Sequence, residues 1–222
     1  MIAAMEWPGT LSVLAHELRS PAAVIAGYAH MLSEERLSDE DRRKAFVQIS
    51  RAAERVALIA QQTADIARWL ATDGLPPGEP VRLSVVLGDA VARRADPSSV
   101  SIELTPEADA VLIRIMDRAA FSAALGTIID AVSREAGEGG VRLKARVASS
   151  TGTCDLLVGE ALLLDRDDPV AEEPPPSFAF GAQGGLGLAF VVAATVLAAH
   201  GGRLWTIGAS RKIIGISFAI GR

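Results

Sequence analysis

The chain has 222 residues, a net charge of −5 and a mean hydropathy of +0.29, which fits one or two domains. Its longest apolar run, near Leu186 to Ala199, is shorter than the ~20 residues of a membrane span. The first residues do not have the pattern of a signal peptide. Scattered basic residues argue against nucleic-acid binding and against a membrane-binding surface. With one cysteine, Cys154, no internal disulfide can form, which suits a reducing cytoplasm.

Residues 1–73 predict a helical hairpin. The first helix covers about 9–33, and the second begins after Ser38, an N-cap followed by three acidic residues. Apolar positions on each helix are spaced alternately by three and four residues: Leu11, Leu14, Leu18, Pro21, Ile25, Tyr28 and Leu32, then Phe46, Ile49, Ala53, Val56, Ala60, Thr63, Ala67 and Leu70. Two such stripes favour a four-helix bundle made by two chains. The alternative is a monomeric hairpin that packs on its own C-terminal domain.

A proline-rich break at 74–80 is interpreted as a linker, and 81–222 as a second domain. The pattern there predicts strands at 81–83, 100–104, 110–115, 141–148, 154–158, 203–207 and 213–220, and helices at 84–95, 118–135 and 186–200. Because the strands cluster in hairpin-like pairs, we expect an α+β fold, a two-layer sandwich. The acidic, proline-rich segment 165–176 is expected to be a mobile surface loop.

Two further residues are interpreted as structural. His200 precedes Gly201 at a predicted helix end, where a cation and a glycine cap both stabilise a helix. Cys154 is expected to occupy an inward strand position.

The run from Leu14 to Pro21 contains the strongest chemical signal. The heptad pattern places His16 opposite the apolar stripe, where its imidazole is exposed and nucleophilic when neutral. Glu17 can take or orient the ring proton, Ser20 lies one turn away on the same face, and Pro21 should bend the helix. A lone surface histidine usually has no function. His30 has the same heptad position without an acid or a proline, so the neighbours select His16.

His-Glu-Leu-Arg-Ser-Pro at 16–21 closely resembles the phosphoacceptor motif of two-component sensor histidine kinases. In that family the motif lies on the first helix of a dimeric four-helix bundle, and an ATPase domain of the gyrase and histidine-kinase type follows. The segment 184–189 (Gly-Gly-Leu-Gly-Leu-Ala) resembles the glycine-rich segment beside the nucleotide phosphates, and 199–204 and 216–220 also fit. The resemblance covers nearly the whole chain.

The family's nucleotide-binding motifs are altered. The helix whose asparagine ligates Mg²⁺ corresponds to 124–132, where Gly126 and Asp130 stand at the usual polar positions. Asp130 can still hold Mg²⁺ through its carboxylate, whereas Gly126 offers no side chain.

The adenine-binding Asp-x-Gly-x-Gly segment corresponds to 160–164, where Glu160 replaces the aspartate and leucines replace both glycines. Leucines do not readily adopt positive φ and would more naturally fill the adenine pocket. Gln183 replaces the first glycine of the third motif. The candidate nucleotide contacts are therefore Asp130, Glu160, Gly185 and Gly187, with Asp130 as the candidate Mg²⁺ ligand.

By this resemblance the chain is a homodimeric histidine phosphorelay protein. His16 exchanges a phosphoryl group with an aspartate of a response-regulator receiver domain, Glu17 assists proton removal, and Ser20 positions an attacking group or water. ATP and Mg²⁺ binding is weak or absent in this interpretation. One alternative is an active ATP-dependent sensor kinase that uses Asp130 and Glu160. The other is a non-catalytic adaptor or inhibitor of a kinase or response regulator.

Overall fold

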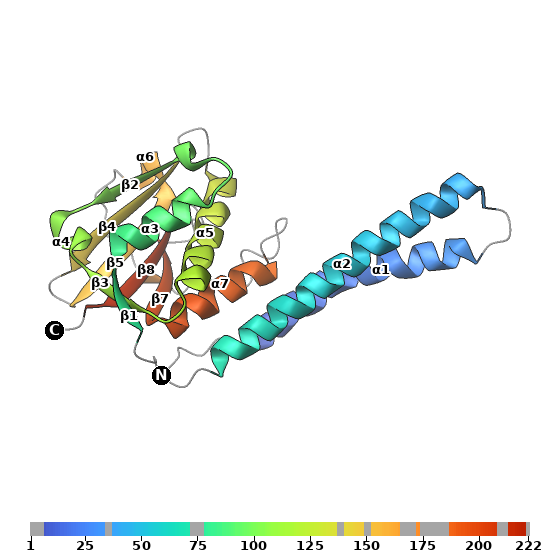
Figure 1. Ribbon diagram of the computed structural model, residues 1–222, viewed down its shortest axis with the longest axis horizontal. Coiled ribbons are helices and arrows are strands. Elements are labelled where there is room, and N and C mark those ends of the chain that lie inside the picture. Colours follow the sequence, from blue (N-terminus) through green and yellow to red (C-terminus); the bar gives the residue numbers. More distant parts are fainter. Residues whose placement is uncertain are drawn as a thin grey trace.

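A long helical hairpin and a mixed α/β domain make up the fold of the computed structural model (Figure 1). The structure describes residues 7–33, 37–71, 78–136, 140–148, 152–164, 172–173, 187–207 and 213–220. The hairpin consists of α1 (Trp7–Leu32) and α2 (Asp39–Leu70), which confirms the two predicted helices. The second helix begins where expected because the Ser38 hydroxyl accepts a hydrogen bond from the Asp41 backbone N–H at 3.1 Å.

The second domain combines short strands with helices. In chain order its elements are β1 (Glu79–Arg82), α3 (Leu83–Ala92), the 3₁₀ turn η1 (Pro97–Ser99), β2 (Val100–Leu104), α4 (Pro106–Asp109), β3 (Leu112–Ile115), α5 (Arg118–Glu135), β4 (Val141–Ala148), β5 (Thr153–Glu160), α6 (Ala161–Leu164), β6 (Glu172–Glu173), α7 (Gly187–Ala199), β7 (Gly202–Ile207) and β8 (Ile213–Ala219). Except for β6, residues 165–176 lie outside the described part of the chain, as do 74–77 of the expected linker.

Within the described residues the main sheet has the strand order β2-β4-β5-β8-β7-β6, and β1 and β3 form a separate antiparallel pair. The neighbours β4 and β5, and likewise β7 and β8, form antiparallel pairs as expected. The expectation of hairpin-like pairs is wrong for β2, which runs parallel to β4. A parallel neighbour requires a crossover, and α5 lies in the connection between these two strands.

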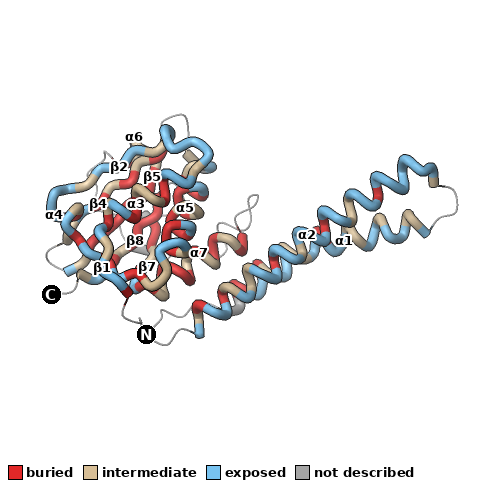
Figure 2. The backbone as a smooth tube through the Cα atoms, in the orientation of Figure 1, coloured by how far each residue is buried: buried red, intermediate tan, exposed pale blue. Residues whose placement is uncertain are grey.

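Helices α3, α5 and α7 cover one face of the main sheet, which confirms the two-layer α+β architecture (Figures 1 and 2). Along β5, Cys154, Leu156 and Val158 face the helices and belong to the main core. The alternate residues face the other side, where Leu157 packs with Trp205 in a smaller apolar cluster. Cys154 is buried as expected, and desolvation raises the pKa of its thiol to about 11.

Helix α7 also packs against the hairpin. Leu188 and Val191 on α7 form a buried apolar cluster with Ile59 and Ile66 on α2. This half of the hairpin therefore packs on its own domain, as the alternative reading of the sequence expected. The far half extends away from the domain (Figure 2). None of the helices in the described ranges is both long enough and apolar enough to cross a membrane.

His200 connects the two parts of the chain. The residue is 3% exposed, and the centroid of its ring lies 5.3 Å from that of Trp69 on α2 and 5.2 Å from that of Phe121 on α5. Nδ1 donates to the Val196 carbonyl at 2.7 Å, and Nε2 has no hydrogen-bond partner in the described structure. Desolvation lowers the pKa of His200, so the expected cation at this helix end is wrong. The glycine cap is confirmed, because Gly201 has φ +77°.

We predict that His200 makes the folded chain sensitive to acid. The pKa of His200 is below its ordinary value of 6.5 in the folded state, so its contribution to stability is complete above about pH 6.5 and is lost as the pH falls below that value. The His200→Phe variant should lose part of the decrease in unfolding free energy between about pH 7.5 and about pH 5, measured by urea denaturation. His30→Gln, which changes an exposed histidine, should keep it. Equal decreases in His200→Phe and wild type would contradict the prediction.

Candidate functional site

His16 lies on the exposed side of α1, as the heptad pattern predicted, and Pro21 is buried. A cleft between the two helices contains His16. It is lined from α1 by His16, Glu17, Ser20, Pro21 and Val24, and from α2 by Gln48, Arg51, Ala52 and Arg55. His16 and Ser20 are both exposed and one helical turn apart. An incoming reactant therefore has open access to this imidazole and to the hydroxyl beside it.

Glu17 faces inward, because adjacent residues on a helix point in different directions. Its side chain is 12% exposed, and Arg55 Nη2 donates a hydrogen bond to Glu17 Oε2. This ion pair joins the two helices beside His16. Since the Arg55 side chain is 42% exposed, solvent screening limits the stabilisation to about 1 kcal/mol or less.

The Glu17 carboxylate also lies against the domain. A Cβ atom at Gly187, the first residue of α7, would come within 2.5 Å of Glu17 Oε1. The N-terminus of a helix carries a partial positive charge that favours a carboxylate. The acid of the phosphoacceptor motif therefore touches the start of the helix where the sequence placed nucleotide phosphates. Gly185 lies outside the described residues.

Asp130 is also engaged by an arginine. Arg94, just beyond α3, donates through Nη1 to Asp130 Oδ1 and through Nη2 to Ser133 Oγ at 3.2 Å. The Arg94 side chain is only 12% exposed, whereas that of Asp130 is 53% exposed. A guanidinium thus neutralises the carboxylate that the sequence offered to Mg²⁺, and Gly126 adds no ligand.

Glu160 ends β5, and the next four residues form the helical turn α6. Leu164 is buried with Leu157 and Trp205 on the sheet face opposite the helices, and Leu162 is 66% exposed. The expectation that the leucines fill an adenine pocket is therefore wrong for these two. A helical turn with outward-packed leucines cannot supply the positive-φ backbone that the two glycines provide.

These residues do not fit a bound nucleotide with Mg²⁺. The carboxylate of Asp130 is held by Arg94, the adenine segment is helical, and the start of α7 meets the Glu17 carboxylate. The structure describes Asp130, Glu160 and Gly187 on α5, β5 and α7, and their role in nucleotide binding remains a prediction.

Residues 9–71 match the family "His Kinase A (phospho-acceptor) domain". This match covers the helical hairpin of α1 and α2. The structure of the Acinetobacter baumannii histidine kinase AdeS is similar with a TM-score of 0.56 and 16% identity, over 93% of this chain and 98% of that one. At this identity the likeness shows the fold, and it extends across both domains.

Two other solved structures are similar over different shares of the chain. Full-length ShkA in complex with AMPPNP has a TM-score of 0.49 and 21% identity, over 95% of this chain and 46% of that one. The mycobacterial sensor histidine kinase MprB has a TM-score of 0.40 and 20% identity, over 63% of this chain and 97% of that one. No curated protein matches the sequence.

Sequence reasoning missed both arginines that hold the motif acids. Arg55 is 38 residues from Glu17, and Arg94 is 36 residues from Asp130. On sequence alone each arginine reads as an ordinary charge on a solvated surface. Heptad spacing is the signal that could have found Arg55, because Arg55 follows Gln48 by seven residues and so lies on the same side of α2, which faces α1.

We predict that Gly187→Ala loosens the contact between the domain and the phosphoacceptor helix. The added methyl group would overlap Glu17 Oε1, so the carboxylate must move. Because the overlapping atom is the end of a flexible side chain, we expect a loss of at most about 1 kcal/mol in the unfolding free energy, from the disturbed pair of Glu17 with Arg55, measured by urea denaturation. The loss should largely disappear when Gly187→Ala is combined with Glu17→Ala. An equal loss in both backgrounds would show that the methyl group strains something other than Glu17.

Proposed function

We propose that this chain is a dimeric histidine phosphorelay protein with little or no ATP-dependent autokinase activity. His16 carries a phosphoryl group and exchanges it with an aspartate of a response-regulator receiver domain. One contrast carries the proposal. His16 is exposed in an open cleft, whereas Asp130, the acid that would hold Mg²⁺, is engaged by Arg94.

In the proposed transfer an imidazole nitrogen of His16 attacks the phosphorus of an aspartyl phosphate. The bond from phosphorus to the aspartate oxygen breaks, the carboxylate leaves, and the imidazole proton passes to Glu17 or to solvent. The reverse reaction returns the group to the receiver. Glu17 shares the cleft with His16, and the Ser20 hydroxyl can donate to a phosphoryl oxygen or position a water.

The ion pair of Arg94 with Asp130 supports the low autokinase activity. Metal coordination by Asp130 would separate it from Arg94, whose side chain is mostly buried. Leaving a largely buried guanidinium without its carboxylate is unfavourable. At the start of α7, the Glu17 carboxylate would also repel a nucleotide phosphate.

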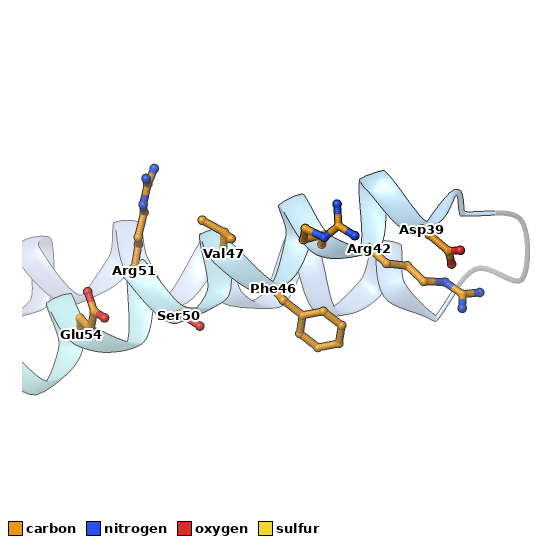
Figure 3. A pocket seen from close by; sticks show the side chains of 8 residues that line it. Asp39, Arg42, Phe46, Val47, Ser50, Arg51 and Glu54 are labelled. Atoms are coloured by element: carbon orange, nitrogen blue, oxygen red, sulfur yellow. The ribbon is translucent and has the colours of Figure 1, made fainter.

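The apolar positions of α2 support the homodimer. Ala45, Ala52, Ile59 and Ile66 recur every seven residues and are buried within the folded chain. The residues that directly follow them, Phe46, Ala53, Ala60 and Ala67, recur with the same period and are exposed. Phe46 is 61% exposed and projects into the open (Figure 3). Two adjacent heptad seams, one filled and one open, are what a four-helix bundle of two chains requires.

This proposal keeps the two parts expected from the sequence, 1–73 and 81–222 joined by 74–80, except that the Trp69 side chain packs in the core of the second part. The lone Cys154 thiol, which is buried in β5, suits the proposed cytoplasmic location.

We predict that phosphorylated receiver domains transfer label to His16. Purified receivers would be labelled with a small-molecule phosphodonor, mixed with the full chain, and the acid-labile, base-stable label would be counted. We expect label on the wild type and none on His16→Gln. His30→Gln is the matched control, because His30 is exposed on the same helix at the same heptad position, and it should label like the wild type.

The same assay with labelled ATP and Mg²⁺ tests the second part of the proposal. Label above background that His16→Gln removes would show an active autokinase and contradict the low activity proposed here. If no receiver in a broad panel labels the wild type, the result would favour the alternative of a non-catalytic adaptor or inhibitor.

We predict a dimer at micromolar concentration by sedimentation velocity. Phe46→Glu puts a charge on the open seam and should shift the chain to monomer, because an unpaired charge within an apolar interface is costly. Leu58→Glu is the control, since Leu58 is also exposed, at 47%, but lies about 120° around α2 from Phe46. A monomeric wild type, or equal effects of the two variants, would contradict this placement of the interface.

A further inference from the structure

The cleft around His16 has an unbalanced charge. Among its lining residues, Glu17 is the one carboxylate, and Arg51 and Arg55 are the two arginines. Arg55 is paired with Glu17. Within the described part of the chain, Arg51 has neither an ion pair nor a hydrogen bond from its side chain. One guanidinium charge is therefore left available beside the phosphoacceptor.

Hydrogen-bond donors line the cleft next to His16. Residues Gln48, Arg51 and Arg55 are spaced by three and four residues, so they share one face of α2. Since α1 and α2 are antiparallel and Arg55 meets Glu17, Arg51 lies about one turn nearer the hairpin loop, at the level of Ser20. The Ser20 hydroxyl, the Gln48 amide and the Arg51 guanidinium are thus donors on the two walls of the same cleft.

This side of α2 stays open in the proposed dimer. Arg51 follows Phe46 by five residues, which places it about 140° around the helix. Figure 3 shows the two side chains projecting in different directions from α2. Arg51 also borders the hollow on α2 that contains Phe46, but pairing through the Phe46 seam leaves the cleft of His16, which Phe46 does not line, accessible.

A phosphoryl group on His16 would bring a charge of about −1.5 to −2 next to the Glu17 carboxylate. Arg55 is already engaged with that carboxylate, so it cannot neutralise the new charge without releasing Glu17. We propose that Arg51 binds the phosphoryl group on His16, with forked donors that match the phosphoryl oxygens. This inference rests on the proposed phosphoryl carriage by His16. Arg51 stabilises the phosphohistidine and orients it for transfer.

Potassium phosphoramidate tests this role without ATP or a receiver. An imidazole nitrogen of His16 attacks the phosphorus, the phosphorus–nitrogen bond breaks, and ammonia leaves with the proton of the imidazole. The rate of phosphohistidine formation in the full chain would be followed by ³¹P NMR. Arg51→Ala should slow formation about tenfold, in line with the loss of one charge-assisted hydrogen bond. Arg51→Lys should restore part of the rate.

Arg43→Ala is the matched control. Arg43 is an exposed arginine two turns before Arg51, and it lines the neighbouring surface of α2 but not the cleft of His16. It should react like the wild type. A general loss of helix would lower the circular dichroism of both variants, so the rates are compared at equal helicity.

A pH titration of the ³¹P resonance gives a second readout, which a purely structural role of Arg51 would leave unchanged. Loss of a neighbouring cation favours the protonated phosphoryl group, so the titration midpoint should rise in Arg51→Ala and stay unchanged in Arg43→Ala. A wild-type rate and midpoint in Arg51→Ala would overturn the role of Arg51 while leaving His16 as the carrier. A wild type that forms no phosphohistidine sensitive to His16→Gln would overturn both.

Discussion

The apolar contact between α7 and the hairpin is the interaction on which the rest of the site depends. Leu188 and Val191 are buried against Ile59 and Ile66, and burying a side chain of this size contributes about 1.5–3 kcal/mol. This packing brings the first residue of α7 onto the Glu17 carboxylate. The contact of Glu17 with Gly187 therefore follows from the apolar packing of α7 on α2. Exposed ion pairs are too weak to hold two domains together.

Two arginines determine what the motif acids can do. Arg55 holds Glu17 in the cleft of His16, and Arg94 holds Asp130 away from any metal. The first pair keeps an acid close to the reacting histidine, so it is compatible with phosphoryl transfer. The second pair engages the carboxylate that the sequence offered as a Mg²⁺ ligand. The same type of interaction thus places one acid beside the exposed His16 and occupies the other acid with a guanidinium.

Local patterns predicted the helical elements well, because caps and heptads depend on neighbouring residues. The start of α2 after Ser38 and the exposure of His16 both follow from such patterns. Contacts between distant segments could not be predicted. Neither the parallel pairing of β2 nor the outward packing of Leu164 has a local signature. His200 is instructive, since its position at a helix end suggested a cation, whereas desolvation by burial beside two aromatic rings lowers its pKa.

The place of Trp69 changes where the chain should be divided. Trp69 belongs to the last turn of α2, yet its side chain is part of the main core of the second domain and packs on His200. A boundary after residue 73, drawn from composition, therefore assigns Trp69 to the hairpin, although its side chain packs in the core of the second domain. A fragment that begins at 81 would fold around a hole the size of an indole, so the minimal autonomous folding unit of this domain includes the end of the phosphoacceptor hairpin.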